Sequence, residues 1–193
     1  MIDLAQAAAA IRAGQVVILP TDTVYGLACD PTSAPAVDRI FAIKGRPPQF
    51  ELSLLAATIT QLDGLVELGV VARSLAAAFW PGPLSLVCPV GPRRLAVPRH
   101  GTSLMVRVPG HPMLRSLLAE TGPVASTSAN RHGQPPAATA EEALGLAGDV
   151  AGILDGGPSP GTASTIIDLT SRPPRVLRGG PIHEAALRPH LDG

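Results

Sequence analysis

Short polar clusters come just after three apolar runs of this chain and carry side chains suited to binding an anion. Thr21 and Thr23 come after VVIL, Lys44 and Arg46 after RIFAI, and Ser126, Ser128 and Asn130 after PVA. Side chains two residues apart in an extended chain point the same way, so each cluster presents a small polar face. Cations suit a polyanion, and hydroxyl and amide groups supply further donors to its oxygens. Taken alone, the STSAN cluster is also typical of an ordinary turn.

Lys44 is the only lysine among the 15 basic residues of the chain. Keeping lysine at one position favours a specific role there, against the alternative of a solvated cation at a helix end. Pro47 disfavours helical geometry at Arg46, so we expect Lys44, Gly45 and Arg46 to be extended with both cations on one face. The residues after Lys44 fit neither a P-loop nor a kinase-type strand lysine.

Two arginines at strand positions are further candidates for ligand contact. Arg107 lies inside the apolar run LMVRV, where a buried charge is costly unless it is paired, so we expect an aspartate partner or a ligand anion. The alternative is an edge strand with Arg107 facing water. Arg178 ends the last apolar run, where the alternative is an exposed strand end. The loop from Gly156 to Thr162 either lets backbone approach a ligand closely or is only a wide turn.

Other common site chemistries are not indicated. GPSPG matches the pattern GxSxG, but Pro160 has no N–H for an oxyanion hole. The five histidines show no metal-ligand spacing, so we expect no metal site formed by the protein alone, and Mg²⁺ carried by a nucleotide needs none. Cys29 and Cys88 lie far apart in no CxxC motif, which favours a reducing cytosol.

Composition indicates a compact, folded domain rather than a highly charged or disordered chain. The chain has 193 residues, is 46% hydrophobic and 16% charged, and has zero formal net charge. This excludes a disordered chain and argues against an obligate nucleic-acid coat. The N-terminus has an acid at Asp3 and no basic segment, so we expect no signal peptide and a cytoplasmic location. Prolines and glycines within residues 74–92 also argue against a membrane span.

Apolar runs bounded by turn residues predict at least seven short strands and about five helices. Helices are expected from an Asp3 cap to Gly14, from a Ser33 cap through Ile43, up to Trp80, over His111–Thr121 and at the C-terminus. Strands are expected at Gln15–Leu19, after PTDT, and at Leu52–Ala57, Leu84–Cys88, Leu104–Val108, Pro123–Thr127, Gly152–Asp155, Ser164–Leu169 and Arg175–Arg178. Because the strands cluster at both ends of the chain, we expect one α/β (α+β) domain over residues 1–193. Its sheet should be twisted, mixed and open, with flanking helices.

The order of these segments resembles the YrdC/Sua5 family, the threonylcarbamoyl-AMP synthases. PTDTVYGL, KGRP, WPGPLSLV, VRVPGHP, STSANRHG, STIIDL and VLRGG follow one another over residues 15–180. The length is similar to the short form of the family, without an extra C-terminal domain. The resemblance implies an open twisted α/β sheet with a cationic concave face.

The resemblance also implies a reaction. L-Threonine, bicarbonate and ATP with Mg²⁺ give L-threonylcarbamoyl-AMP and pyrophosphate by adenylyl transfer. Downstream threonylcarbamoyl transferase proteins then modify the adenosine beside the anticodon of tRNA. A weak tRNA or other RNA contact is compatible with this reading, and a membrane partner is not expected.

Site residues follow from the same resemblance. Catalytic and phosphate-binding roles fall on Lys44 and Arg46, further nucleotide contacts on Ser126, Ser128, Asn130 and Arg178, and the threonine pocket on Thr23, Tyr25, Arg107 and Ser164. Glu51 and Leu55 depart from the family pattern, standing where many members have proline and histidine.

A function of another class remains open at this point. The cationic cavity could serve a non-catalytic RNA-binding module. Zero net charge and only five aromatic residues argue against it, because single-stranded RNA is usually bound on aromatic stacking platforms.

Overall fold

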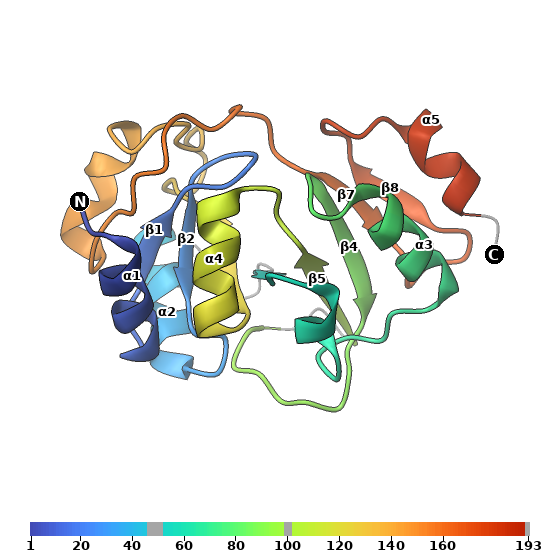
Figure 1. Cartoon of the computed structure of the whole chain (residues 1–193), viewed down its shortest axis with the longest axis horizontal. Coiled ribbons are helices and arrows are strands. Elements are labelled where there is room, and N and C mark those ends of the chain that lie inside the picture. The colour runs from blue at the N-terminus through green and yellow to red at the C-terminus, as the bar shows by residue number, and fades with distance from the viewer. Residues whose placement is uncertain (46–51, 99–101, 192–193) are drawn as a thin grey trace.

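The structure is a computed structural model that describes residues 1–45, 52–98 and 102–191. A mixed sheet forms its central layer (Figure 1). The strands in this part are β1 (Val17–Leu19), β2 (Gly26–Cys29), β3 (Ser53–Leu55), β4 (Leu84–Pro89), β5 (Ser103–Arg107), β6 (Val124–Ser128), β7 (Thr165–Asp168) and β8 (Arg175–Arg178). Their order is β1-β2-β6-β3-β5-β4-β7-β8. The β3–β5 and β4–β7 pairs are parallel and the others antiparallel. The expected mixed, open sheet is confirmed.

Helices cover both faces of this sheet. They are α1 (Leu4–Arg12), α2 (Ala34–Lys44), α3 (Val70–Phe79), α4 (Pro112–Thr121) and α5 (Glu184–Leu187), with 3-10 turns at Ile59–Leu62, Glu142–Asp149 and Arg188–His190. α1 and α4 lie side by side on one face (Figure 1). Because side chains alternate along a strand, Val17 and Leu19 pack with α1 and α4, while Ile18 packs in the cluster that contains α2. None of the described helices is long and apolar enough to cross a membrane.

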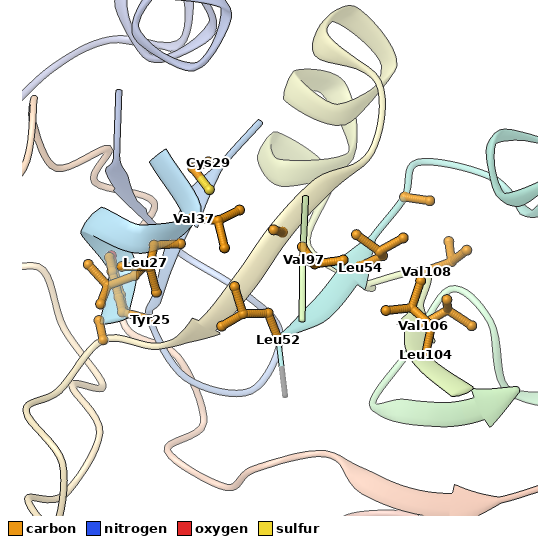
Figure 2. Packing of buried hydrophobic residues seen from close by; sticks show 14 of the residues in the cluster. Tyr25, Leu27, Cys29, Val37, Leu52, Leu54, Val97, Leu104, Val106 and Val108 are labelled. Atoms are coloured by element: carbon orange, nitrogen blue, oxygen red, sulfur yellow. The ribbon is translucent and has the colours of Figure 1, made fainter. Parts of the chain in front are cut away.

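The larger apolar cluster lies on the α2 and α3 side and joins the two halves of the sheet. Leu54, Leu104 and Val106 of the central strands are 0–3% exposed, and they pack in the same cluster as Leu27 and Val37 (Figure 2). The opposite face of these central strands is therefore held in a fixed position and is free to carry polar side chains.

The ends of α1 are set as the sequence predicts, whereas α2 runs one residue further. Asp3 caps α1 in a capping box with Gln6. α2 continues through Lys44, and Gly45 takes a left-handed conformation with φ of 62°. The expectation of an extended Lys44 and Gly45 is therefore wrong, because a glycine after the last turn ends a helix without a Cβ penalty. Pro47 restricts only the residue before it, Arg46, which lies outside the described residues.

The segment Gly152–Asp155 was also expected to be a strand, and this is wrong in part. It forms isolated parallel bridges, Ile153 with Ile18 and Leu154 with Ile2, rather than a ladder. The chain leaves the sheet at Asp155, whose carboxylate accepts a hydrogen bond from the Gly157 N–H. An apolar run predicts an extended chain, which is present. The turn at Asp155 ends it before a ladder of β-sheet hydrogen bonds can form.

We expect Gly45→Ala to lower the free energy of unfolding by about 1–2 kcal/mol, because a Cβ disfavours the left-handed conformation. No atom of the described residues lies within 4 Å of the added Cβ, so a clash with them does not account for the loss. Urea denaturation measures the change. Gly145→Ala is the matched control, since that position has open space without a positive φ. Equal stabilities of the two variants would contradict the argument.

Candidate functional site

A cavity of about 470 Å³ lies on the sheet face that carries α1 and α4, and we refer to it as the central pocket. Its principal lining residues are Thr21, Thr23, Tyr25, Ser53, Leu55, Ser85, Met105, Arg107, Ser126, Ser128, Ser164 and Arg178. Strand register forms the floor. Ser53 pairs with Ser126 on one side and with Met105 on the other, and Leu55 pairs with Arg107. Residues of β3, β5 and β6 thereby meet on one surface.

Gly26 leaves room beside this floor. A Cβ built on Gly26 would lie 2.9 Å from Ser126 Oγ and 3.2 Å from the Thr127 carbonyl. A larger residue would therefore require the Ser126 side chain to turn and the Thr127 backbone to shift. The glycine therefore brings β2 close to β6 where Ser126 and Ser128 line the pocket.

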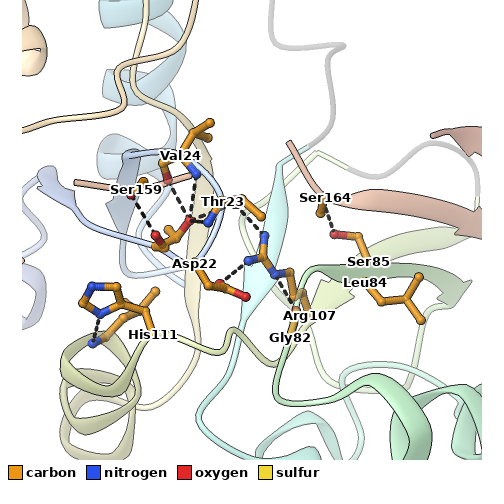
Figure 3. Close-up of polar contacts among 12 residues, drawn as sticks. Asp22, Thr23, Val24, Gly82, Leu84, Ser85, Arg107, His111, Ser159 and Ser164 are labelled. Atoms are coloured by element: carbon orange, nitrogen blue, oxygen red, sulfur yellow. Dashed lines mark hydrogen bonds and ion pairs between the residues drawn. The ribbon is translucent and has the colours of Figure 1, made fainter. Parts of the chain in front are cut away.

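Arg107 is the buried cation of the central pocket and is 5% exposed. Its Nη2 is paired with the Asp22 carboxylate, Nη1 donates to Thr23 Oγ1 at 3.0 Å, and Nε donates to the Gly82 carbonyl at 3.0 Å. Figure 3 shows the guanidinium between these three segments. Burial lowers the pKa of Arg107, and the nearby Asp22 carboxylate opposes that shift. The expected aspartate partner of Arg107 is therefore present, and an edge strand facing water is not.

Asp22 was not among the residues singled out in the sequence. It stands between Thr21 and Thr23, and a pattern that counts every second residue passes over it. One of its oxygens, Oδ2, is buried without a hydrogen-bond partner among residues 1–45, 52–98 and 102–191. A charged residue between two pocket hydroxyls, with a buried arginine elsewhere in the chain, was the available signal.

Lys44 meets the STSAN segment at the end of β6 and is 2% exposed. Its side chain is buried, and Nζ donates to the carbonyls of Ser128 (2.7 Å) and Asn130 (3.0 Å) and to Asn130 Oδ1 (2.9 Å). Ser128 Oγ donates to the same Oδ1 at 2.5 Å. Ser128 lines the central pocket, whereas Lys44 and Asn130 do not.

Asn130 is held by its own turn. Its Nδ2 donates to the carbonyls of Arg131 at 3.0 Å and Gln134 at 2.7 Å. The structure thus brings Lys44, Ser128 and Asn130 together, with the asparagine amide bonded inside the turn. Arg46, the other half of the predicted cation pair, lies outside the described residues, as does Glu51.

Arg178 is the exposed cation of the central pocket. It lies at the end of β8, and its Nε and Nη2 donate to the carbonyl and hydroxyl of Ser164, both at 3.0 Å. Ser164 Oγ lies 2.8 Å from Ser85 Oγ. Two donor groups of Arg178 thus fix its orientation, and its Nη1 has no partner among the described residues. Burial lowers the pKa of Arg178, which stays charged at neutral pH because guanidinium pKa values are so high.

Tyr25 lines the pocket but uses its hydroxyl elsewhere. The hydroxyl donates to the Gly157 carbonyl at 2.8 Å and accepts from the Gly156 N–H at 3.3 Å. Further along the same loop, Ser159 Oγ donates to the Thr21 carbonyl at 2.8 Å. The Gly/Pro loop is therefore bonded to the segment that carries Thr21 and Thr23 and borders the pocket.

Ser53, Ser85 and Leu55 also line the pocket without having been proposed as ligand contacts. Each serine is the single polar residue inside an apolar run, LSLL or LSLV, and that interruption was the signal. Leu55, where many family members have histidine, makes the floor apolar beside Arg107.

Metal and thiol chemistry are not supported by side chains of this site. The described residues contain no group of three or more His, Cys, Asp or Glu placed to hold a metal ion. Cys29 and Cys88 are free and buried, and burial raises the pKa of each thiol to about 12. The pocket instead offers hydroxyls and guanidinium groups, which suit oxyanions.

We expect Asp22→Asn to lower the free energy of unfolding by about 3–5 kcal/mol, because it leaves the buried Arg107 charge without its counter-ion. Glu120→Gln is the matched control. It breaks the exposed Arg12–Glu120 pair and should cost less than about 1 kcal/mol. Urea denaturation compares the two. Similar losses in both variants would show that the Asp22 pair is no stronger than a surface pair.

We expect Tyr25 to ionise later in the native protein than in the unfolded chain, because burial raises its pKa above 10.0. Tyr25 is the only tyrosine, so tyrosinate absorbance reports this residue alone. The folded state then holds its proton more tightly, and stability should fall as the pH rises above about 10. Identical titration curves with and without urea would contradict this.

The chain matches known proteins over most of its length. A model of the Sua5/YciO/YrdC family, described as telomere recombination, matches residues 9–180. A Mycobacterium tuberculosis relative is 45% identical over 184 residues, covering 93% of this chain and 84% of the relative. Threonylcarbamoyl-AMP synthase of Chromohalobacter salexigens is 40% identical and covers 87% of this chain and 93% of its own.

A solved structure agrees with these matches. Pyrococcus abyssi Sua5 in complex with L-threonine superposes with a TM-score of 0.91 at 37% identity, over 98% of this chain. This chain spans only 57% of that longer protein. From the matched residues and the shared fold, the chain belongs to the Sua5/YciO/YrdC family.

Proposed function

We propose that this chain is a threonylcarbamoyl-AMP synthase. The observation that carries the proposal is one pocket in which a partly free guanidinium, Arg178 of β8, meets the hydroxyls of Ser126 and Ser128 of β6 and of Ser164, which precedes β7. Family relatives bear this enzyme's name, and a family structure holds L-threonine. A volume of about 470 Å³ falls within the usual range of small-molecule sites.

The proposed reaction is a nucleotidyl transfer to a carbamate. The amine of L-threonine adds to bicarbonate, water leaves, and the resulting carbamate oxygen attacks the α-phosphorus of ATP. The bond to pyrophosphate breaks, and L-threonylcarbamoyl-AMP remains. No protein nucleophile is needed, so catalysis rests on positioning and on neutralising phosphate charge. Serines and arginines without a nucleophile–base pair fit that requirement.

Arg178 is the residue that we assign to direct phosphate contact. Its two bonds to Ser164 hold the guanidinium plane, and Nη1 remains available. A planar fork of donors in a fixed orientation suits an anion with two oxygens in one plane. The exposed position of Arg178 lets a triphosphate reach it without displacing an ion pair.

Lys44 is assigned a different part of the same work. Its Nζ lies 3.4 Å from Ser128 Oγ, and Ser128 lines the pocket. The ammonium charge therefore acts on a phosphate bound at Ser128 while also holding the Ser128 and Asn130 oxygens in place. A charge with fixed partners costs no reorganisation when the transition state forms.

L-Threonine is assigned to the part of the pocket lined by Thr23, Tyr25 and Arg107. There the Arg107 guanidinium is bonded to Thr23 Oγ1, so its charge and the hydroxyl form one fixed polar surface for a carboxylate or hydroxyl. Mg²⁺ is assigned to the oxygens of ATP, where it would neutralise the charge of the departing pyrophosphate.

A threonylcarbamoyl transferase is the partner class that the product requires. L-Threonylcarbamoyl-AMP is an activated mixed anhydride, and an enzyme that acts on tRNA would accept its acyl group. The RNA contact of this chain, on this proposal, is secondary to catalysis.

We expect pyrophosphate release from ATP to require both L-threonine and bicarbonate. Arg178→Met should lower the rate about 10²–10³-fold, because it removes a preorganised charge from the transferring phosphoryl group. Arg175→Met is the matched control. It lies on the same strand, β8, and is exposed, but it does not line the central pocket.

Two results would contradict the proposal. Pyrophosphate release that is indifferent to L-threonine would remove the substrate assignment. RNA binding that weakens steeply with salt, without any threonine-dependent turnover of ATP, would favour the RNA-binding module instead.

A further inference from the structure

A second cavity, of about 330 Å³, lies between α3, the segment after β3 and the start of α4, and we refer to it as the side pocket. Its floor and walls include Ala57, Ala76, Trp80, Pro81 and Val108. Two arginines, Arg73 of α3 and Arg115 of α4, also line it. No residue is shared with the central pocket.

Arg115 is the unusual residue of the side pocket. Its Nε is buried and has no hydrogen-bond partner in the part of the chain that the structure describes. A buried donor of a charged group without an acceptor costs free energy that is not recovered inside the protein. Elsewhere in the described chain, buried Arg107 has an acceptor for each of its three nitrogens. An acceptor from outside the protein would remove this cost at Arg115.

Arg73 supplies a second positive charge to the same cavity. Its Nε donates to the Leu68 carbonyl at 3.0 Å, which anchors the exposed side chain. No acidic residue of the described chain lines the side pocket. Two guanidinium groups without a counter-ion at one small cavity suit an oxyanion, because arginine matches phosphate and carboxylate oxygens geometrically.

Trp80 gives the cavity an aromatic wall with a fixed position. Its Nε1 donates to the Leu84 carbonyl at 2.7 Å, so the indole cannot turn without losing that bond. With the alanines, Pro81 and Val108, it provides apolar surface next to the cations. An inorganic anion alone would leave this surface unused.

We propose that the side pocket binds a small phosphomonoester whose phosphate is joined to a planar, apolar group. Arg115 and Arg73 would bind the phosphate, and Trp80 with its apolar neighbours would cover the planar group. The cavity volume lies at the lower end of the range for ligand pockets, which fits a molecule with a single ring.

Trp80 also provides the measurement, because it is the only tryptophan of the chain. We expect phenyl phosphate to change the Trp80 fluorescence with a saturable titration. Inorganic phosphate and phenol, each of which offers half of the recognised group, should bind at least about tenfold more weakly. The full chain is used, without ATP or threonine.

Three variants locate the signal. Arg115→Met should weaken phenyl phosphate binding about ten- to a hundredfold, the usual worth of a hydrogen bond to a charged group. Arg94→Met, an exposed arginine that does not line either pocket, is the matched control and should leave the titration unchanged. Arg178→Met should also leave it unchanged, since it removes a cation from the central pocket only.

The outcomes are decisive in either direction. If Arg115→Met does not fold, Arg73→Met gives the same test from an exposed position, with an expected loss of a few-fold or more. Absence of a fluorescence change with phenyl phosphate overturns the proposal. So does a titration that survives Arg115→Met and Arg73→Met, or one that is lost in Arg178→Met, which would place the ligand in the central pocket.

Discussion

Two buried cations, Arg107 and Lys44, need oxygen acceptors, and their bonds to those acceptors hold the walls of the central pocket together. Arg107 draws its acceptors from Asp22, Thr23 and the Gly82 carbonyl. Lys44 draws its acceptors from Ser128 and Asn130. Because an unpaired buried charge costs several kcal/mol, these segments cannot separate without a large loss of stability. The pocket walls are therefore fixed before any ligand arrives.

The same need divides the cations by function. The side-chain nitrogens of Arg107 and Lys44 donate to oxygens of the protein. In Arg178, Nε and Nη2 donate to Ser164, and Nη1 is left for the pocket. Fixed charges that already have partners create a steady positive potential, whereas a half-committed guanidinium can bind an incoming phosphate. Electrostatic catalysis benefits from both, since neither has to reorganise far during the reaction.

The sequence predicts the strands of the sheet well. It predicts site residues only where residues close in the sequence indicate them. Apolar runs and caps such as Asp3 indicate the elements because they depend on local spacing. Asp22 and Ser85 were missed because their partners are distant: Ser85 meets Ser164 79 positions later through the parallel pairing of β4 and β7. The extended geometry expected at Lys44 and Gly45 is wrong for the opposite reason: the restriction imposed by Pro47 is local to Arg46 and does not extend to the two residues before it.

The need of a buried cation for oxygen acceptors also distinguishes the side pocket from the central pocket. In the central pocket the protein supplies the oxygens, so the buried guanidinium of Arg107 serves structure first. In the side pocket the Arg115 Nε is buried without an acceptor among the described residues, although Thr58 lines the same cavity. One further polar side chain beside Arg115 would supply an acceptor for this N–H, as Asp22 and Thr23 do for Arg107. An arginine left in this condition beside a second arginine and a fixed indole is better explained by an external oxyanion than by chance packing, because no acidic residue of the described chain lines that cavity.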